Sequence, residues 1–173
     1  MKHQICVAAL VGIMLGHSLF AGERSSEWIG KPAPELGKGA WINSPPLALR
    51  ELRGHVVLLE FWTFGCENCL HTLSHVRGWY AKYPHSAFQI IGIHTPEFQY
   101  EKDVRAVTRE TGRLGITYPV TTDNDYGTWN RYHQQYWPVM YLLDKHGIIR
   151  YVHVGEGDYD ETQRQIASLL AED

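Results

Sequence analysis

The sequence has few cysteines and no large excess of charge of either sign. Its 173 residues include three Cys, 16 Lys and Arg, and 19 Asp and Glu, for a net charge of −3. These charges are interspersed, so the chain has no basic stripe for a nucleic-acid backbone and no acidic tail. We therefore expect no nucleic-acid partner. The length suits one domain with one core, which we expect to be a monomer.

Long apolar runs are also missing, except near the start of the chain. Lys2 precedes an apolar run over residues 5–20, and Leu-Phe-Ala ending at residue 21 is a tolerable cleavage site. We expect residues 1–21 to be a signal peptide and 22–173 to be one domain, located in the periplasm or otherwise exported. An uncleaved membrane anchor is the alternative, although the run is shorter than the roughly 20 residues that span a bilayer.

Cleavage of the leader would remove Cys6 and leave only Cys66 and Cys69. In an oxidising compartment free thiols tend to form disulfides. A disulfide between residues this close closes almost no loop, so it would constrain the unfolded chain weakly. A redox role therefore explains these two cysteines better than a structural disulfide does.

The residues around the two cysteines do not match the common metal or haem sites that contain such a pair. A haem attachment site has His directly after the second cysteine, and Leu70 stands there. A structural zinc site usually needs a second ligand pair, and the close candidates, His71 and His75, fall on a helix face turned away from Cys69. We expect no metal and no cofactor, with zinc as the minor alternative.

Hydrophobic periodicity predicts an α/β fold. Residues 56–62 and 88–94 are apolar on both faces, which is typical of central strands in a sheet flanked by helices. The other expected elements are a helix from Cys66 to Pro84, a helix with Tyr100, Val104 and Val107 on one face, a strand at 118–122, a helix at 125–136, a hairpin of 139–143 with 148–154, and a last helix with a capping box of Asp158 and Glu161.

The position of the cysteines suggests their chemistry. A thiolate is the nucleophile in disulfide exchange, and the N–H groups and dipole at a helix N-terminus stabilise it. Cys66 has that position, whereas Cys69 lies one turn further in and would be shielded. We expect Cys66 to attack and Cys69 to resolve the mixed disulfide.

Two glutamates lie near the cysteine pair in the sequence, Glu60 before it and Glu67 between the two cysteines. Glu60 is the only carboxylate in an apolar strand, and burial would let it take and return a proton as Cys69 becomes a nucleophile. The alternative is that a polar neighbour simply satisfies it. Glu67 places an anion beside Cys66, which should destabilise the thiolate. We therefore predict a reductant with a potential nearer about −270 mV than about −120 mV.

The chain resembles the thioredoxin superfamily, and more narrowly its exported TlpA and ResA-like branch. The likeness extends over residues 28–170 and is greatest to the thioredoxin-like domain of DipZ-type proteins. Five separated motifs carry it, in this order: Phe61-Trp62-Thr63, His94-Thr95-Pro96-Glu97-Phe98, Asp123-Asn124-Asp125-Tyr126, Tyr136-Trp137-Pro138 and Gly155-Glu156-Gly157-Asp158-Tyr159.

The resemblance implies a thioredoxin-like fold, with a central mixed sheet flanked by helices, an inserted strand and helix, and an N-terminal extension. It implies that Cys66 attacks, that Cys69 resolves and that Glu60 is the buried acid beside the second cysteine. Pro138 would be a cis-proline facing the disulfide, and Trp137 would help to form the substrate-binding surface. Electrons would come from a membrane thiol reductase of the DsbD or CcdA type.

The predicted function is an exported thiol-disulfide oxidoreductase, reductive in direction, that acts on protein thiols and disulfides. The alternative from another class is a delivery module that holds Cu(I) with the same two sulfurs. Peroxide reduction is a minor possibility, because Thr63 matches a peroxiredoxin position but Leu59 replaces the proline of that motif. Asn68 replaces the proline common before the second cysteine.

Overall fold

The computed structural model describes residues 27–172, so the expected signal peptide lies outside the described residues. Within that range no helix combines the length and apolar character needed to cross a bilayer. The elements follow one another as β1 (Trp41–Ile42), η1 (Leu49–Leu52), β2 (Val56–Trp62), α2 (Glu67–Lys82), β3 (Phe88–His94), η2 (Gln99–Lys102), α3 (Val104–Arg113), β4 (Val120–Thr122), α4 (Gly127–Arg131), β5 (Val139–Leu143), β6 (Ile149–Val154) and α5 (Tyr159–Ala171).

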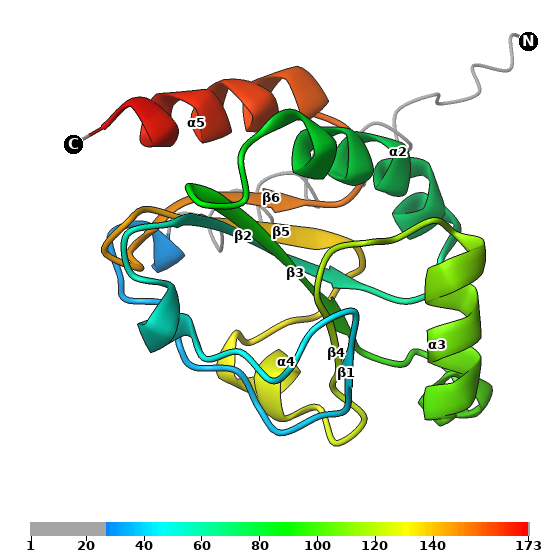
Figure 1. Cartoon of the computed structure of the whole chain (residues 1–173). Helices are drawn as coiled ribbons and strands as arrows, with labels where there is room; N and C mark the ends of the chain where they lie inside the picture. Colours follow the sequence, from blue (N-terminus) through cyan, green and yellow to red (C-terminus); the bar gives the residue numbers. More distant parts are fainter. Residues whose placement is uncertain (1–26, 173) are drawn as a thin grey trace, which may run out of the picture.

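The six strands form one mixed sheet in the order β1-β4-β3-β2-β5-β6. β2 pairs in parallel with β3, which pairs in parallel with β4, whereas β5 runs antiparallel to β2. Every residue of β2 is buried, which agrees with its apolar sequence. The predicted fold class, an α/β fold with a mixed sheet between helices, is confirmed (Figure 1).

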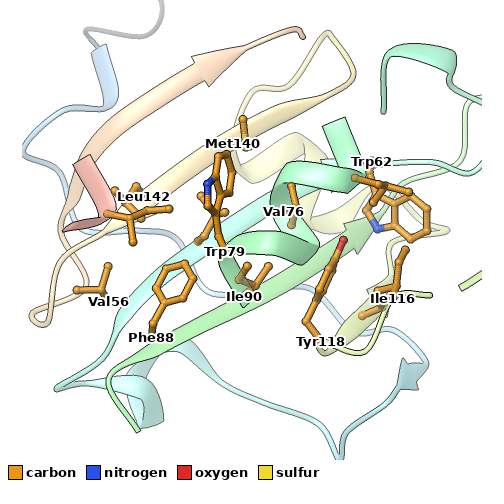
Figure 2. Packing of buried hydrophobic residues seen from close by; sticks show 14 of the residues in the cluster. Val56, Trp62, Val76, Trp79, Phe88, Ile90, Ile116, Tyr118, Met140 and Leu142 are labelled. Atoms are coloured by element: carbon orange, nitrogen blue, oxygen red, sulfur yellow. The ribbon is translucent and has the colours of Figure 1, made fainter. Parts of the chain in front are cut away.

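Side chains alternate along β2 between two cores. Leu58 and Trp62 belong to the core beneath α2 and α5, whereas Leu59 and Phe61 belong to the core on the opposite face. Figure 2 shows the first core, where side chains of α2 lie over those of the sheet. By the same alternation Glu60 points into the first core, which also contains Cys69.

Three expected helix features are wrong, and the first of them has a capping interaction as its cause. The chain from Tyr100 to Val107 is not one helix. Asp103 interrupts it, and its side chain accepts a hydrogen bond from the N–H of Arg105 and caps α3. Tyr100 therefore lies in η2 and is exposed, whereas Val107 is buried in α3.

The other two differences concern α4 and α5. The helix expected at 125–136 is reduced to Gly127–Arg131, although Tyr132 still packs in the second core. The capping box predicted at Asp158 does not form, because Asp158 adopts a left-handed φ of 47° and its side chain makes no capping hydrogen bond. Glu161 instead accepts hydrogen bonds from Arg164 and Gln165.

Candidate active site

Several loops meet at one edge of the sheet. Trp62 pairs with His94, and His94 pairs with Thr122, so the three parallel strands end together there. The antiparallel strand β5 begins at the same edge with Val139, opposite Phe61. The cysteine loop, the loops that follow β3 and β4, and the loop before β5 are thereby brought together by topology.

The structure joins Cys66 and Cys69 in a disulfide, with their Cα atoms 5.2 Å apart. Cys66 is the N-cap of α2, and its Sγ accepts a hydrogen bond from the backbone N–H of Cys69 at 3.2 Å. Cys66 is partly exposed, whereas Cys69 is fully buried in the first core. The two cysteines therefore differ in their exposure to solvent.

Glu60 is fully buried, and it lies in β2 on the face that is covered by α2. Its Oε2 accepts a hydrogen bond from the Tyr118 hydroxyl at 2.9 Å, and its Oε1 has no hydrogen-bond partner among the described residues. Burial raises the pKa of Glu60 from its ordinary value of 4.5 to about 7, and the bond from Tyr118 opposes that shift. One polar neighbour therefore exists, but it leaves half of the carboxyl group unsatisfied.

Trp137 and Pro138 lie in the loop directly before β5. The peptide bond between them is cis, as the resemblance implies. The Trp137 indole N–H donates to the Thr95 carbonyl at 3.1 Å, and its ring stacks on Trp129 with centroids 4.1 Å apart. Trp137 is thus fixed between the loop after β3 and α4, and it remains partly exposed.

His94 and Thr63 form a buried polar contact directly below the cysteine loop. His94 Nε2 lies 3.2 Å from Thr63 Oγ1, and the Phe64 ring stacks on the imidazole with centroids 5.4 Å apart. Burial lowers the pKa of His94 to about 4, while the negative charge of Glu101 opposes that shift. A neutral imidazole therefore supports the loop that leads to Cys66.

Glu101 is a second buried carboxylate at the site, and sequence reasoning did not find it. Its Oε1 accepts from the backbone N–H of Gly65 at 2.9 Å, and its Oε2 accepts from the N–H groups of Glu97 at 2.7 Å and Phe98 at 2.9 Å. One side chain thereby joins the cysteine loop to the loop after β3. The spacing of Phe98 and Glu101, three residues apart, was the only sequence signal for this role.

Histidines near the pair do not form a metal site. His71 pairs with Glu156 at the surface, and His75 stacks on Tyr159 with centroids 3.6 Å apart. Among residues 27–172 no group of three or more His, Cys, Asp and Glu side chains is arranged to hold a metal ion. Both histidines are exposed surface residues.

A thioredoxin-like fold with a Cys-x-x-Cys disulfide at the start of a helix is the arrangement of the thiol-disulfide oxidoreductase class, to which relatives and structural neighbours of this chain belong. The chain belongs to the AhpC/TSA family, whose model matches residues 29–152. Within the thioredoxin superfamily its relatives are of the TlpA and ResA-like kind, as predicted.

Three comparisons illustrate these relations. The chain is 44% identical over 142 residues to the protein DipZ of Mycobacterium bovis, covering 80% of this chain and 20% of DipZ, so it spans about a fifth of that relative. It is 24% identical over 143 residues to the thiol-disulfide oxidoreductase YkuV of Bacillus subtilis, covering 82% of this chain and 96% of YkuV. A thiol-disulfide isomerase structure from Corynebacterium glutamicum superposes with a TM-score of 0.73 at 28% identity, covering 82% of this chain and 98% of that one.

Proposed function

We propose that the chain is an exported thiol-disulfide oxidoreductase that reduces disulfides in protein substrates. The observation that carries this proposal is the unequal environment of the two sulfurs at the start of α2. Cys66 is partly exposed and takes the N-cap position, whereas Cys69 and Glu60 are buried in the same core. That arrangement suits one nucleophile open to a substrate and one resolving thiol beside a proton acceptor.

In the proposed reaction the Cys66 thiolate attacks one sulfur of a substrate disulfide. A bond forms between that sulfur and Cys66 Sγ, and the second substrate sulfur leaves as a thiolate. The Cys69 thiolate then attacks Cys66 Sγ, so the internal disulfide forms and the first substrate sulfur is released. Two electrons pass from the dithiol to the substrate, and the two released thiolates take up protons.

Glu60 is proposed to act as the proton carrier for Cys69. A buried thiol must lose its proton before it can resolve the mixed disulfide, and direct access to water is limited for Cys69. A carboxyl group with a pKa of about 7 changes its protonation state near neutral pH at little energetic cost. Its Oε1, which has no hydrogen-bond partner within residues 27–172, is available for that transfer.

The reducing direction rests on Glu67, which lies exposed in the first turn of α2 directly after Cys66. A neighbouring anion disfavours the thiolate and so offsets part of the stabilisation that the helix N-terminus provides. Strong oxidants depend on a stabilised reduced form, so this arrangement favours a potential near about −270 mV. Renewed reduction requires a dithiol donor, for which we propose a membrane thiol reductase of the DsbD or CcdA type.

Export and substrate binding complete the proposal. Residues 1–21 would direct the chain out of the cytoplasm, which agrees with its likeness to DipZ and to ResA. Trp137 and Pro138 would contact an extended segment of the substrate next to the disulfide. Trp137 suits this role because its ring is held on one side by Trp129 and stays partly exposed.

Trapping of the mixed disulfide tests the proposal. The Cys69→Ala variant, incubated with insulin in its disulfide-bonded form, should accumulate a covalent adduct through Cys66. Added dithiothreitol should cleave that adduct. Cys66→Ala is the matched control and should form none. Wild-type protein should reduce insulin catalytically when a dithiol donor is supplied, and an adduct of equal yield in both variants would contradict the assignment of roles.

The Cu(I) module is separated by a second measurement on the reduced wild-type protein. Tight equimolar binding of Cu(I), in competition with a chelator, together with no insulin turnover would favour that alternative. Insulin turnover with a measured potential near about −270 mV would support the reductase. A potential near about −120 mV would overturn the proposed direction of electron flow.

A further inference from the structure

We propose that Phe64, Phe98 and Tyr100 form an aromatic shelf beside Cys66 that receives an apolar side chain of the substrate polypeptide. This side chain would be a near neighbour of the reacting substrate cysteine. The inference rests on the proposed function and adds a specificity-determining surface to it. Phe98 and Tyr100 belong to the segment between β3 and α3, and Phe64 belongs to the cysteine loop between β2 and α2.

The exposure of these rings is unusual for this molecule. Among residues 27–172 the large apolar side chains with high exposure are Ile29, Phe98, Tyr100, Val104 and Tyr136. Phe98 and Tyr100 are 49% and 59% exposed. Single exposed apolar residues are common, but a contiguous group marks an interaction surface. Phe98 and Tyr100 lie on the segment that Glu101 connects to the cysteine loop by hydrogen bonds. Their exposure therefore indicates an interaction surface.

The three rings form one continuous surface. Phe98 and Tyr100 stack with centroids 5.7 Å apart and an interplanar angle of 5°, and Tyr100 lies 5.9 Å from the Phe64 ring. Phe64 also stacks on the buried His94, so the shelf is supported by the protein interior. Flat aromatic faces arranged in this way offer area for a substrate ring or aliphatic chain at a small cost in side-chain entropy.

The shelf reaches to within one residue of the attacking cysteine. A β-carbon added to Gly65 would lie only 2.7 Å from the Tyr100 hydroxyl oxygen, so Tyr100 sits directly against the residue before Cys66. Successive residues of an extended peptide are about 3.3 Å apart. A polypeptide whose sulfur bonds to Cys66 can therefore place a side chain one or two residues from its cysteine on the shelf.

Glu101 is the positioning residue for this surface. Its buried carboxylate accepts hydrogen bonds from the N–H groups of Gly65 and Phe98, and so fixes the shelf to the cysteine loop. Two further bonds hold the ends of the segment, from the Tyr126 hydroxyl to the Pro96 carbonyl at 2.7 Å and from the Asn124 side chain to the Lys102 carbonyl at 2.8 Å. A surface fixed before binding loses less entropy on complex formation.

Selectivity between two peptide disulfides tests the shelf. Each substrate is a symmetric disulfide dimer of a pentapeptide with a central cysteine, followed by Phe in one and by Ser in the other. The reduced wild-type protein should react about tenfold faster with the Phe peptide, as expected for partial burial of one aromatic side chain. The double variant Phe98→Ala and Tyr100→Ala should lower this ratio of second-order rate constants below about twofold.

Ile29→Ala is the matched control, because Ile29 is 46% exposed and adjoins Gly30, whose N–H binds the Ile149 carbonyl at the opposite end of the sheet. That variant should keep the wild-type ratio. Glu101→Ala should also lower the ratio, and Glu101→Gln, which retains a carbonyl acceptor, should keep part of it. A purely structural role would change the free energy of unfolding without changing this ratio.

The outcomes distinguish the shelf from the proposed function. If the wild-type protein reduces neither peptide, the proposed function fails and the shelf fails with it. Equal rates for both peptides, or a ratio that the double variant leaves unchanged, would overturn the shelf alone. Self-association of the wild-type protein that the double variant abolishes, with peptide selectivity unchanged, would instead assign the surface to a second copy of the chain.

Discussion

Two buried carboxyl groups of this protein, those of Glu60 and Glu101, have very different hydrogen-bond environments. Glu60 in β2 and Glu101 in η2 are both fully shielded from solvent. Glu101 accepts hydrogen bonds from three backbone N–H groups, whereas Glu60 accepts one from a tyrosine and has one oxygen unpartnered among the described residues. The number of hydrogen-bond donors, rather than the degree of burial, distinguishes the two carboxyl groups.

This comparison shows how one residue type serves two purposes. Backbone donors hold the carboxylate of Glu101 in one place, and it organises the loops around it. Glu60 lacks that compensation, so burial raises its pKa to about 7 and the group is ready to exchange a proton. We expect substitutions at Glu101 to affect structure first, and substitutions at Glu60 to affect pH-dependent behaviour first.

The largest effect is expected for Glu101→Ala. Removal of a charged acceptor from three N–H groups should lower the free energy of unfolding by about 4 kcal/mol, since each such bond contributes about 1.5–3 kcal/mol and water replaces part of the loss. Urea denaturation measures this change. Glu97→Ala is the control, because its exposed side chain makes no such bonds and should alter stability by less than about 0.5 kcal/mol. Equal stability of both variants would remove the distinction between the two carboxylates.

The next effect concerns Glu60 and pH. The folded protein keeps the Glu60 proton up to about pH 7, whereas the unfolded chain loses it near 4.5. The folded state therefore binds more protons in this window, and stability is lost as pH rises through it. Relative to Glu60→Gln, the wild-type free energy of unfolding should fall by about 3 kcal/mol between pH 4 and pH 8. A constant difference between the two proteins across that range would contradict the raised pKa.

A smaller effect is expected for Tyr118→Phe. Loss of the hydroxyl removes the hydrogen bond that opposes the shift at Glu60, so the pKa of Glu60 should rise further. In single-turnover reduction of a peptide disulfide, the pH midpoint assigned to Glu60 should move upward. The midpoint should stay in place in Tyr80→Phe, whose ring contacts Tyr118 but makes no hydrogen bond to Glu60. A downward shift in Tyr118→Phe would contradict the assigned hydrogen bond.

Much of the fold could be predicted from particular segments. The apolar runs in β2 and β3 specify buried central strands whatever the loops do, and the change of period after Cys66 specifies the start of α2. Glu60 could be singled out because a charge in such a run is rare, and the structure places it in a core. Its role in proton transfer stays a prediction.

The segment between Pro96 and Asp103 could not be predicted in the same way. Glu101 stands among largely exposed residues, and its contact with Gly65 of the cysteine loop, 36 residues away in the sequence, gives no local signal. The apparent helical spacing of Tyr100 and Val104 was misleading, because the cap formed by Asp103 separates them. Local periodicity says nothing of bonds between loops from different strands.

The most direct test of the account is the titration of Glu60 itself. Protein labelled with ¹³C at glutamate carboxyl carbons, followed by NMR across pH, should contain a resonance with a midpoint of about 7 that disappears in Glu60→Gln. That result would establish a buried carboxyl group able to exchange a proton at neutral pH. A Glu60 resonance that titrates near the ordinary value of 4.5 would contradict the account.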